Sequence, residues 1–232
     1  MKKVLITGAS SGIGAALCTH YAQHHQVIAC SRRNVVNASG NITPLQFDVT
    51  DEQQVKAAAE QINDIDIVIL NAGSCEYIDD ATHFDSALFE RVIATNLLSV
   101  GYCLGAFLPK MVKGAQLVIV SSSAAILPLP RAEAYGSSKA ALSYLTKTLA
   151  LTLPDIEVSL VSPGFVDTPL TAKNHFEMPF LMSADAAAQR IATGISKRKR
   201  HIAFPKRLIF SMYLLKLLPF SLWRRWAQGM SK

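Results

Sequence analysis

The sequence predicts an α/β fold, in which helices cover both faces of a doubly wound parallel sheet. Two observations lead to this prediction. Short apolar runs alternate with longer helical stretches, and several runs, such as Val4–Ile6 and Leu117–Val120, are continuously apolar. Such runs are typical of parallel strands that are buried on both faces. Repeated β-α-β units imply right-handed crossovers in an open sheet, and 232 residues are enough for one large domain.

The predicted elements follow one another in a regular order. Strands are expected at Val4–Ile6, Gln26–Cys30, Leu45–Phe47, Ile65–Leu70, Leu117–Val120 and Glu157–Val161. Helices are expected at Ile13–His24, Glu52–Ile62, Asp85–Leu108 and Glu133–Leu153, followed by a helix over Ser183–Ile195 and an edge strand at His201–Phe204. We therefore expect one domain at residues 1–205 and a C-terminal tail at residues 206–232.

Composition excludes several classes of protein. Half of the residues are apolar, which argues against disorder. The four cysteines are scattered and the six histidines show no ligand spacing beside them, so we expect neither a metal site nor a disulfide framework. This cysteine usage fits a reducing cytoplasm. The apolar run after Met1 ends at Thr7-Gly8, which is too short for a signal peptide.

The net charge of +6 is concentrated at the C-terminus. Residues 197–232 hold ten Lys or Arg and no Asp or Glu, whereas the remaining residues hold 13 basic and 17 acidic side chains. The body is thus mildly acidic, and the positive balance does not indicate nucleic-acid binding.

A glycine-rich loop directly follows the first predicted strand and opens the first helix. It reads Thr-Gly-Ala-Ser-Ser-Gly-Ile-Gly over residues Thr7–Gly14. Glycines allow a tight turn and the close approach of a pyrophosphate, and the helix N-terminus offers free N–H groups and a positive dipole end. In this position the loop indicates a dinucleotide-binding site.

The end of the second predicted strand indicates which dinucleotide is bound. An Asp or Glu at this point holds a free ribose 2′-hydroxyl, and it would repel a 2′-phosphate. The chain instead has Ser31, which is neutral, and Arg32, which can form a charge-assisted fork with phosphate. We therefore expect NADP(H) rather than NAD(H). Arg33 fits a solvated surface arginine.

Tyr135 and Lys139 lie four residues apart in a predicted helix, so their side chains share one face. A tyrosine normally keeps its proton to about pH 10, and a nearby ammonium lowers its pKa. The pair is therefore a candidate proton donor and acceptor for catalysis near neutral pH.

Together these motifs resemble the short-chain dehydrogenase/reductase family in its compact single-domain branch. The glycine loop has that family's spacing, and further matches run in order as far as residue 169. The resemblance implies a Rossmann-like domain that transfers a hydride reversibly between a nicotinamide and a small-molecule carbonyl or secondary alcohol. It also implies a homodimer or homotetramer in the cytoplasm.

The resemblance also implies a set of cofactor-binding residues. They are Gly8, Ser10, Ser11, Gly12, Ile13, Gly14, Ser31, Arg32, Asp48, Val49, Asn71, Ala72, Gly73, Tyr135, Lys139, Pro163, Gly164, Val166 and Thr168.

Four residues are implied to be catalytic: Asn96, Ser122, Tyr135 and Lys139. Ser122 lies at the end of a predicted strand and thirteen residues before Tyr135, which is the family's offset, with Ser123 as the alternative in register. Tyr135 would exchange the proton, Lys139 would bind the nicotinamide ribose, Ser122 would orient the carbonyl, and Asn96 would support a proton path to the lysine.

The substrate side is predicted to be apolar. Its candidate residues are Ile126, Leu127, Leu129, Phe165, Leu170, Phe176, Met178, Phe180 and Met182. These residues favour a lipophilic substrate, although the same side chains also suit the packing of a lid.

The tail is basic, aromatic and apolar, and it is too interrupted to span a bilayer, which takes roughly 20 apolar residues. This composition suits a membrane interface. It equally suits a helix that packs over the substrate pocket or against a second subunit.

Two other functions compete with the oxidoreductase. A non-catalytic nucleotide sensor or scaffold could use the same fold, but such a protein would be expected to lose Ser122, Tyr135 or Lys139. An epimerase or dehydratase of the same superfamily usually has a separate substrate region, for which this chain has no room.

Overall fold

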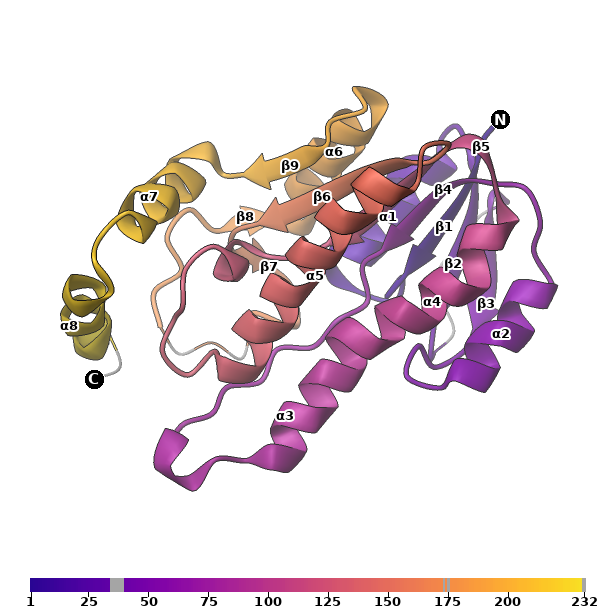
Figure 1. Cartoon of the computed structure of the whole chain (residues 1–232). Helices are drawn as coiled ribbons and strands as arrows, with labels where there is room; N and C mark the ends of the chain where they lie inside the picture. Colours follow the sequence, from indigo (N-terminus) through magenta and orange to yellow (C-terminus); the bar gives the residue numbers. More distant parts are fainter. Residues whose placement is uncertain (34–39, 173, 175, 231–232) are drawn as a thin grey trace.

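The computed structural model describes residues 1–33, 40–172, 174 and 176–230. Seven parallel strands form one sheet in the order β3-β2-β1-β4-β5-β6-β9 (Figure 1). Their bounds are Lys3–Thr7 (β1), Gln26–Ser31 (β2), Ile42–Gln46 (β3), Ile65–Leu70 (β4), Met111–Val120 (β5), Glu157–Pro163 (β6) and His201–Phe204 (β9). The order of the strands reverses between β1 and β4, and ligands bind at such a switch point in open α/β sheets. The predicted doubly wound fold is confirmed.

Helices cover both faces of the sheet. The helices of the body are Gly12–Ala22 (α1), Glu52–Glu60 (α2), Ser86–Ile93 (α3), Ser99–Phe107 (α4), Glu133–Thr152 (α5) and Ala184–Ser196 (α6), and those of the tail are Lys206–Lys216 (α7) and Phe220–Met230 (α8). Side chains alternate along each strand, so one strand serves two cores. Val118 packs in the core under α1 and α6, whereas Leu117 and Ile119 pack in the core under α2, α4 and α5. This explains why β5 has a continuous apolar run.

The helix predicted over Asp85–Leu108 is interrupted by a π-helical turn at Ala94–Leu98, between α3 and α4. By length and composition alone, the stretch Ser86–Lys110 is apolar enough to cross a membrane. In the fold this stretch contacts α2, α5 and β4, so one side of it packs against the body of the domain.

Some element boundaries differ from the prediction for local reasons. β3 lies at Ile42–Gln46, earlier than expected, because it is an edge strand in which Thr43 and Pro44 are exposed and the apolar signal is weak. β5 begins at Met111, well before Leu117, and its early part includes exposed polar residues. A second sheet of two short strands, β7 (Val166–Asp167) and β8 (Met182–Ser183), was not predicted.

The tail forms α7 and α8, which extend from the end of the sheet to one side of the molecule (Figure 1). Its buried side chains Ile209, Met212 and Trp223 form a third apolar cluster with Ile126 and Leu127 of the body. The tail therefore packs on the segment that follows Ser122.

Candidate active site

A cleft of about 500 Å³ opens at the carboxyl ends of the parallel strands. Of the predicted cofactor and catalytic residues, every one lines this cleft except Gly14 and Asn96. The fold thus brings together segments from β1, β2, β4, β5, α5 and the loop after β6.

The glycine loop leaves no room for larger residues. Gly8 has a φ of 70°, and a Cβ there would lie 2.9 Å from the Cα of Ala72. A Cβ on Gly14 would lie 2.1 Å from the carbonyl oxygen of Gly8, so α1 can begin this close to β1 only with glycine. The Asn71 side chain fixes the turn, since its Nδ2 donates to the carbonyl of Thr7 at 3.1 Å.

The start of α1 is available to an anion. Ser11 is the N-cap residue, and its side chain makes no capping hydrogen bond. The first N–H groups of a helix have no partner within the helix, and they face a ligand with the positive end of the helix dipole. Ser10, Ser11 and Gly12 all line the cleft beside this helix end. The loop therefore fits the pyrophosphate of a dinucleotide.

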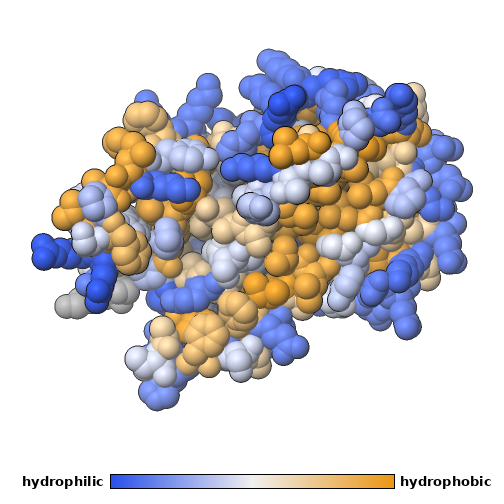
Figure 2. Space-filling view, in the orientation of Figure 1, coloured by the Kyte–Doolittle hydropathy of each residue, from blue (hydrophilic) through white to orange (hydrophobic). Residues whose placement is uncertain are grey.

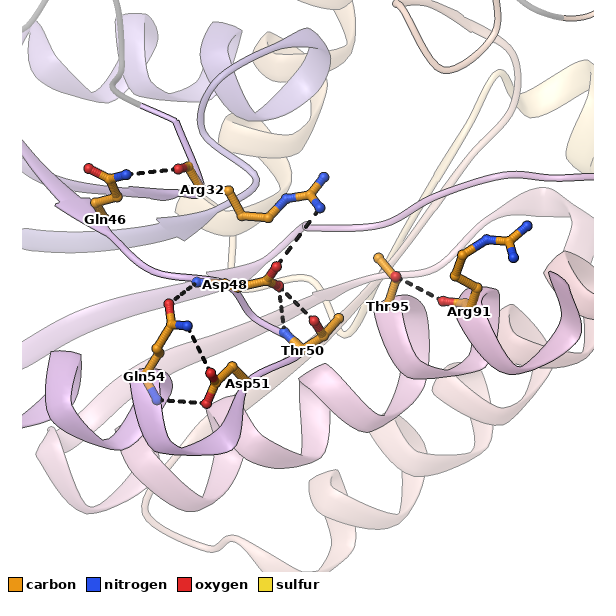
Figure 3. Close-up of polar contacts among 8 residues, drawn as sticks. All are labelled: Arg32, Gln46, Asp48, Thr50, Asp51, Gln54, Arg91 and Thr95. Atoms are coloured by element: carbon orange, nitrogen blue, oxygen red, sulfur yellow. Dashed lines mark hydrogen bonds and ion pairs between the residues drawn. The ribbon is translucent and has the colours of Figure 1, made fainter. Parts of the chain in front are cut away.

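Figure 3 shows the region at the ends of β2 and β3, where Arg32 points toward Asp48. The Asp48 carboxylate accepts hydrogen bonds from Thr50 N at 2.9 Å and Thr50 Oγ1 at 2.8 Å, so it is held in place. The Arg32 guanidinium lies 3.9 Å from it and is 73% exposed. Exposed pairs at such distances contribute little, and Arg32 is therefore able to turn toward a phosphate. Its backbone is fixed by a hydrogen bond from Gln46.

Asn96 lies in the π-helical turn and is fully buried. Its Oδ1 accepts from Ser74 N at 2.7 Å, and its Nδ2 donates to Ser74 O and to Ser138 Oγ, both at 2.9 Å. Asn96 therefore links the segment after β4 to helix α5. The link to α5 is made at Ser138, the residue before Lys139. It is a positioning residue rather than part of the cleft wall.

Tyr135 and Lys139 both face the cleft from α5. Burial raises the pKa of Tyr135 well above its usual value, Cys75 adds to the rise, and a hydrogen bond with Ser122 partly offsets it. Lys139 Nζ donates to Val120 O at 3.0 Å and lies 5.8 Å from the Tyr135 ring centroid. The expected lowering of the Tyr135 pKa by Lys139 was therefore wrong for this arrangement, because burial is the largest influence and Lys139 is not among the groups that shift this pKa.

Lys139 responds to burial in the opposite sense. Its side chain is almost fully buried, and burial lowers its pKa from 10.5 to about 8. Lys139 therefore loses its proton in the weakly alkaline range, at a lower pH than an exposed lysine does.

The three consecutive serines after β5, at positions 121 to 123, lie differently relative to the cleft. Ser122 lines the cleft, and its Oγ accepts from Ala124 N at 3.1 Å. Ser121 also reaches the cleft, but its hydroxyl donates to the carbonyl of Lys139 at 2.7 Å. Ser123 is buried outside the cleft lining. Geometry therefore favours Ser122 over Ser123.

A family model described as short chain dehydrogenase matches residues 2–178. The chain belongs to the short-chain dehydrogenase/reductase family. An uncharacterised oxidoreductase from Myxococcus xanthus is 34% identical over 239 residues, which cover 94% of this chain and 93% of that protein.

Two solved structures share the fold. A short chain dehydrogenase from Burkholderia cenocepacia in complex with NADP has a TM-score of 0.87 and 23% identity, over 97% of this chain and 98% of that one. A short chain dehydrogenase/reductase from Burkholderia phymatum in complex with NAD has a TM-score of 0.82 and 21% identity, over 91% of each chain. The predicted family, fold class and enzyme class are confirmed, and the protein is an oxidoreductase of this family.

In this short-chain dehydrogenase/reductase, sequence reasoning missed several residues of the cleft. Ser74, Cys75 and Glu76 line it directly after the Asn-Ala-Gly motif, and Thr95 lines it beside Asn96. The position of Ser74–Glu76 after β4 could have identified them, since residues that follow parallel strands lie at the ligand-binding edge. Thr95 gave no such signal, because it lies within a predicted helix.

Of the nine candidate substrate residues, Met178 accepts a hydrogen bond from Asn174 Nδ2 and Phe180 is exposed. The other seven divide into three groups. Leu170 lines the cleft. Phe165 and Phe176 stack edge to face with centroids 6.0 Å apart, and Phe176 makes a similar contact with Tyr77. Met182 packs against the sheet core and Ile126, Leu127 and Leu129 against the tail, so these four residues act in packing.

Proposed function

We propose that this oxidoreductase transfers a hydride between NADP(H) and the carbonyl or secondary alcohol of a lipophilic small molecule. The observation that carries the proposal is the convergence of Ser122, Tyr135 and Lys139 in one cleft with the glycine loop. The bound nicotinamide supplies the hydride chemistry. The residues of the chain bind, orient and exchange the proton.

Tyr135 exchanges the proton with the substrate oxygen. Its raised pKa keeps the phenol protonated near neutral pH, so it is a donor when the carbonyl is reduced. Ser122, which lines the same cleft as Tyr135, orients the carbonyl. Lys139 holds ribose hydroxyls of the cofactor, and Asn96 keeps the segment after β4 in place beside it.

Replacing Tyr135 tests this assignment. Tyr135→Phe removes the proton donor and keeps the ring, so we expect at least a 100-fold loss of NADPH oxidation with hydrophobic aldehydes and ketones. NADPH affinity, measured by fluorescence titration, should stay within about twofold. Tyr144→Phe, on an exposed face of the same helix, is the matched control and should keep full turnover.

Turnover retained in Tyr135→Phe with any substrate of the wild type would contradict the role of Tyr135. A wild-type protein that binds NADPH and turns over none of these substrates would instead support the nucleotide-sensing function.

The preference for NADP(H) is proposed from Arg32. Charge-assisted hydrogen bonds to phosphate are each worth about 1.5–3 kcal/mol, so Arg32→Ala should weaken NADPH binding at least tenfold and change NADH binding little. Arg33→Ala is the comparison, because Arg33 also lines the cleft. Equal wild-type affinity for NADPH and NADH would reject the preference.

The remaining proposals concern the setting of the reaction. Apolar residues such as Leu170 on the substrate side support a lipophilic substrate. Cys18, Cys30, Cys75 and Cys103 are free thiols, which supports a reducing cytoplasm. We also propose a catalytic domain at residues 1–205 with a tail at residues 206–232, and a homodimer or homotetramer.

A further inference from the structure

We propose that the tail docks this protein on the surface of a bilayer that contains anionic phospholipid. The contact is made by an outer stripe of α7 and its C-cap residue, defined as Phe210, Tyr213, Leu214 and Leu217, together with the exposed apolar residues of α8. Vesicle binding needs no turnover, so this proposal is tested independently of the proposed reaction.

Helix α7 has two apolar faces. Its inner face, with Ile209 and Met212 buried and Leu208 and Leu215 partly buried, packs against the body. The outer stripe recurs at i, i+3, i+4 and i+7 and is exposed, reaching 71% for Phe210 and 80% for Leu217. A helix that only packs on a body needs one such face. The second apolar face therefore has no partner within the described part of the chain.

Helix α8 likewise has apolar residues that pack on the body and other apolar residues that are exposed. Trp223 and Ala227 are buried against the body, whereas Phe220, Leu222 and Trp226 are exposed. An exposed tryptophan beside arginines is suited to the boundary between water and acyl chains, where an amphipathic ring places its apolar body in lipid and its N–H in the headgroups. Figure 2 shows hydrophobic and strongly hydrophilic residues side by side on this part of the molecule.

The positive charge of the tail indicates which partner binds this surface. Lys206, Arg207, Lys216, Arg224 and Arg225 are exposed. No ion pair involves them among the described residues. Residues 197–232 contain no acidic side chain, so two tails facing each other would repel. An anionic lipid surface, by contrast, meets both the apolar stripe and the unpaired positive charge.

The contacts that the inner face of the tail makes with the body hold the outer stripe close to the active-site cleft. Trp223 Nε1 donates to Pro128 O at 2.9 Å, in the segment that follows Ser122. In the loop after β6, which holds the candidate cofactor-binding residue Gly164, a Cβ on that glycine would lie 2.7 Å from Leu208 of α7. Docking would therefore bring both loops of the site close to the lipid surface, where a lipophilic substrate is concentrated.

Vesicle co-sedimentation of the full chain tests the proposal. We expect the wild type to bind vesicles of phosphatidylcholine with phosphatidylglycerol, and to bind pure phosphatidylcholine at least tenfold more weakly. Phe210→Ser/Leu217→Ser should weaken binding to the anionic vesicles at least tenfold, because it removes two exposed apolar side chains from the stripe. Phe84→Ser is the matched control, because this exposed aromatic lies outside the tail, and it should bind like the wild type.

The fluorescence of each tryptophan reports on its own surroundings. The test therefore does not depend on whether the double variant of α7 folds correctly. In Trp223→Phe the emission of Trp226 should shift to shorter wavelength with anionic vesicles. In Trp226→Phe the emission of the buried Trp223 should not shift. No shift for Trp226, or equal loss of binding in the matched control, would overturn the proposal. Tail-dependent association with an acidic protein but not with vesicles would also overturn it.

Discussion

Lys139 is almost completely buried, yet the proposed reaction uses its positive charge. Its hydrogen bond explains how the charge is tolerated, since Nζ donates to the carbonyl oxygen of Val120. Burial remains the largest influence, so the folded state holds this proton less tightly than the unfolded chain does.

The pKa of Lys139 predicts a specific dependence of stability on pH. Between about pH 8 and pH 10.5 the unfolded chain keeps a proton that the folded protein has released. The free energy of unfolding contributed by Lys139 therefore rises with pH across this window, and the full destabilisation, about 3 kcal/mol, applies below it. Urea unfolding of the wild type and of Lys139→Met between pH 7 and pH 10 measures it. The wild type should gain stability relative to the variant as pH rises, and two parallel curves would contradict the assignment.

At the scale of single residues, the sequence predicted best where a motif has one geometric solution. Gly8 and Gly14 could be placed because no other residue fits the turn, and Tyr135 and Lys139 because four residues make one helical turn. The hydrogen bonds of Asn96 were not predictable, because they depend on the π-helical turn. The pKa of Tyr135 was misjudged because burial depends on packing from distant segments.

At the scale of secondary structure, the elements with strong periodicity were placed well and the edge elements were not. Strands β1 and β4 are buried on both faces, and their sequences carry a continuous apolar signal. Edge strand β3 and the short strands β7 and β8 carry little of that signal, since their positions depend on pairing with a neighbour. The π-helical turn has no pattern of its own within an apolar helix.

The π-helical turn has a clear local effect. It carries the Asn96 side chain, whose hydrogen bonds reach Ser74 and Ser138 across the gap between β4 and α5. Such turns are rare in helices and often occur at functional sites. The interruption of the helix between α3 and α4 is thus part of how the cleft is assembled.

At the scale of the whole molecule, an apolar face lies over α4 and α5, as Figure 2 shows beside the ribbon of Figure 1. Leu98, in the π-helical turn before α4, and Tyr144 and Leu151, on α5, are exposed, with Tyr144 and Leu151 at 77% and 86%. Gly101 and Gly105 on α4 have open space where a Cβ would be, so another helix could approach closely. This face supports the proposed homodimer or homotetramer.

Two charges placed on this face should separate the subunits. For Tyr144→Glu/Leu151→Glu, we expect light scattering after size-exclusion chromatography to give the mass of one protomer, because burying two carboxylates in an interface is costly. The wild type should give a multiple of that mass. Phe210→Glu/Leu217→Glu on the tail should leave the oligomer intact. A monomeric wild type, or an unchanged mass in the α5 variant, would reject this interface.

The hydrogen bond between Trp223 and Pro128 spans 95 residues of sequence. During synthesis the chain emerges from its N-terminus, and domains begin to fold in that order. The sheet strands and the glycine loop are therefore complete while the anchor of the Ser122 segment is still unmade. This enzyme would therefore complete its catalytic cleft only after Trp223 has been synthesised, and a chain truncated before Trp223 would keep the dinucleotide side of the cleft while lacking the anchor of the Ser122 segment.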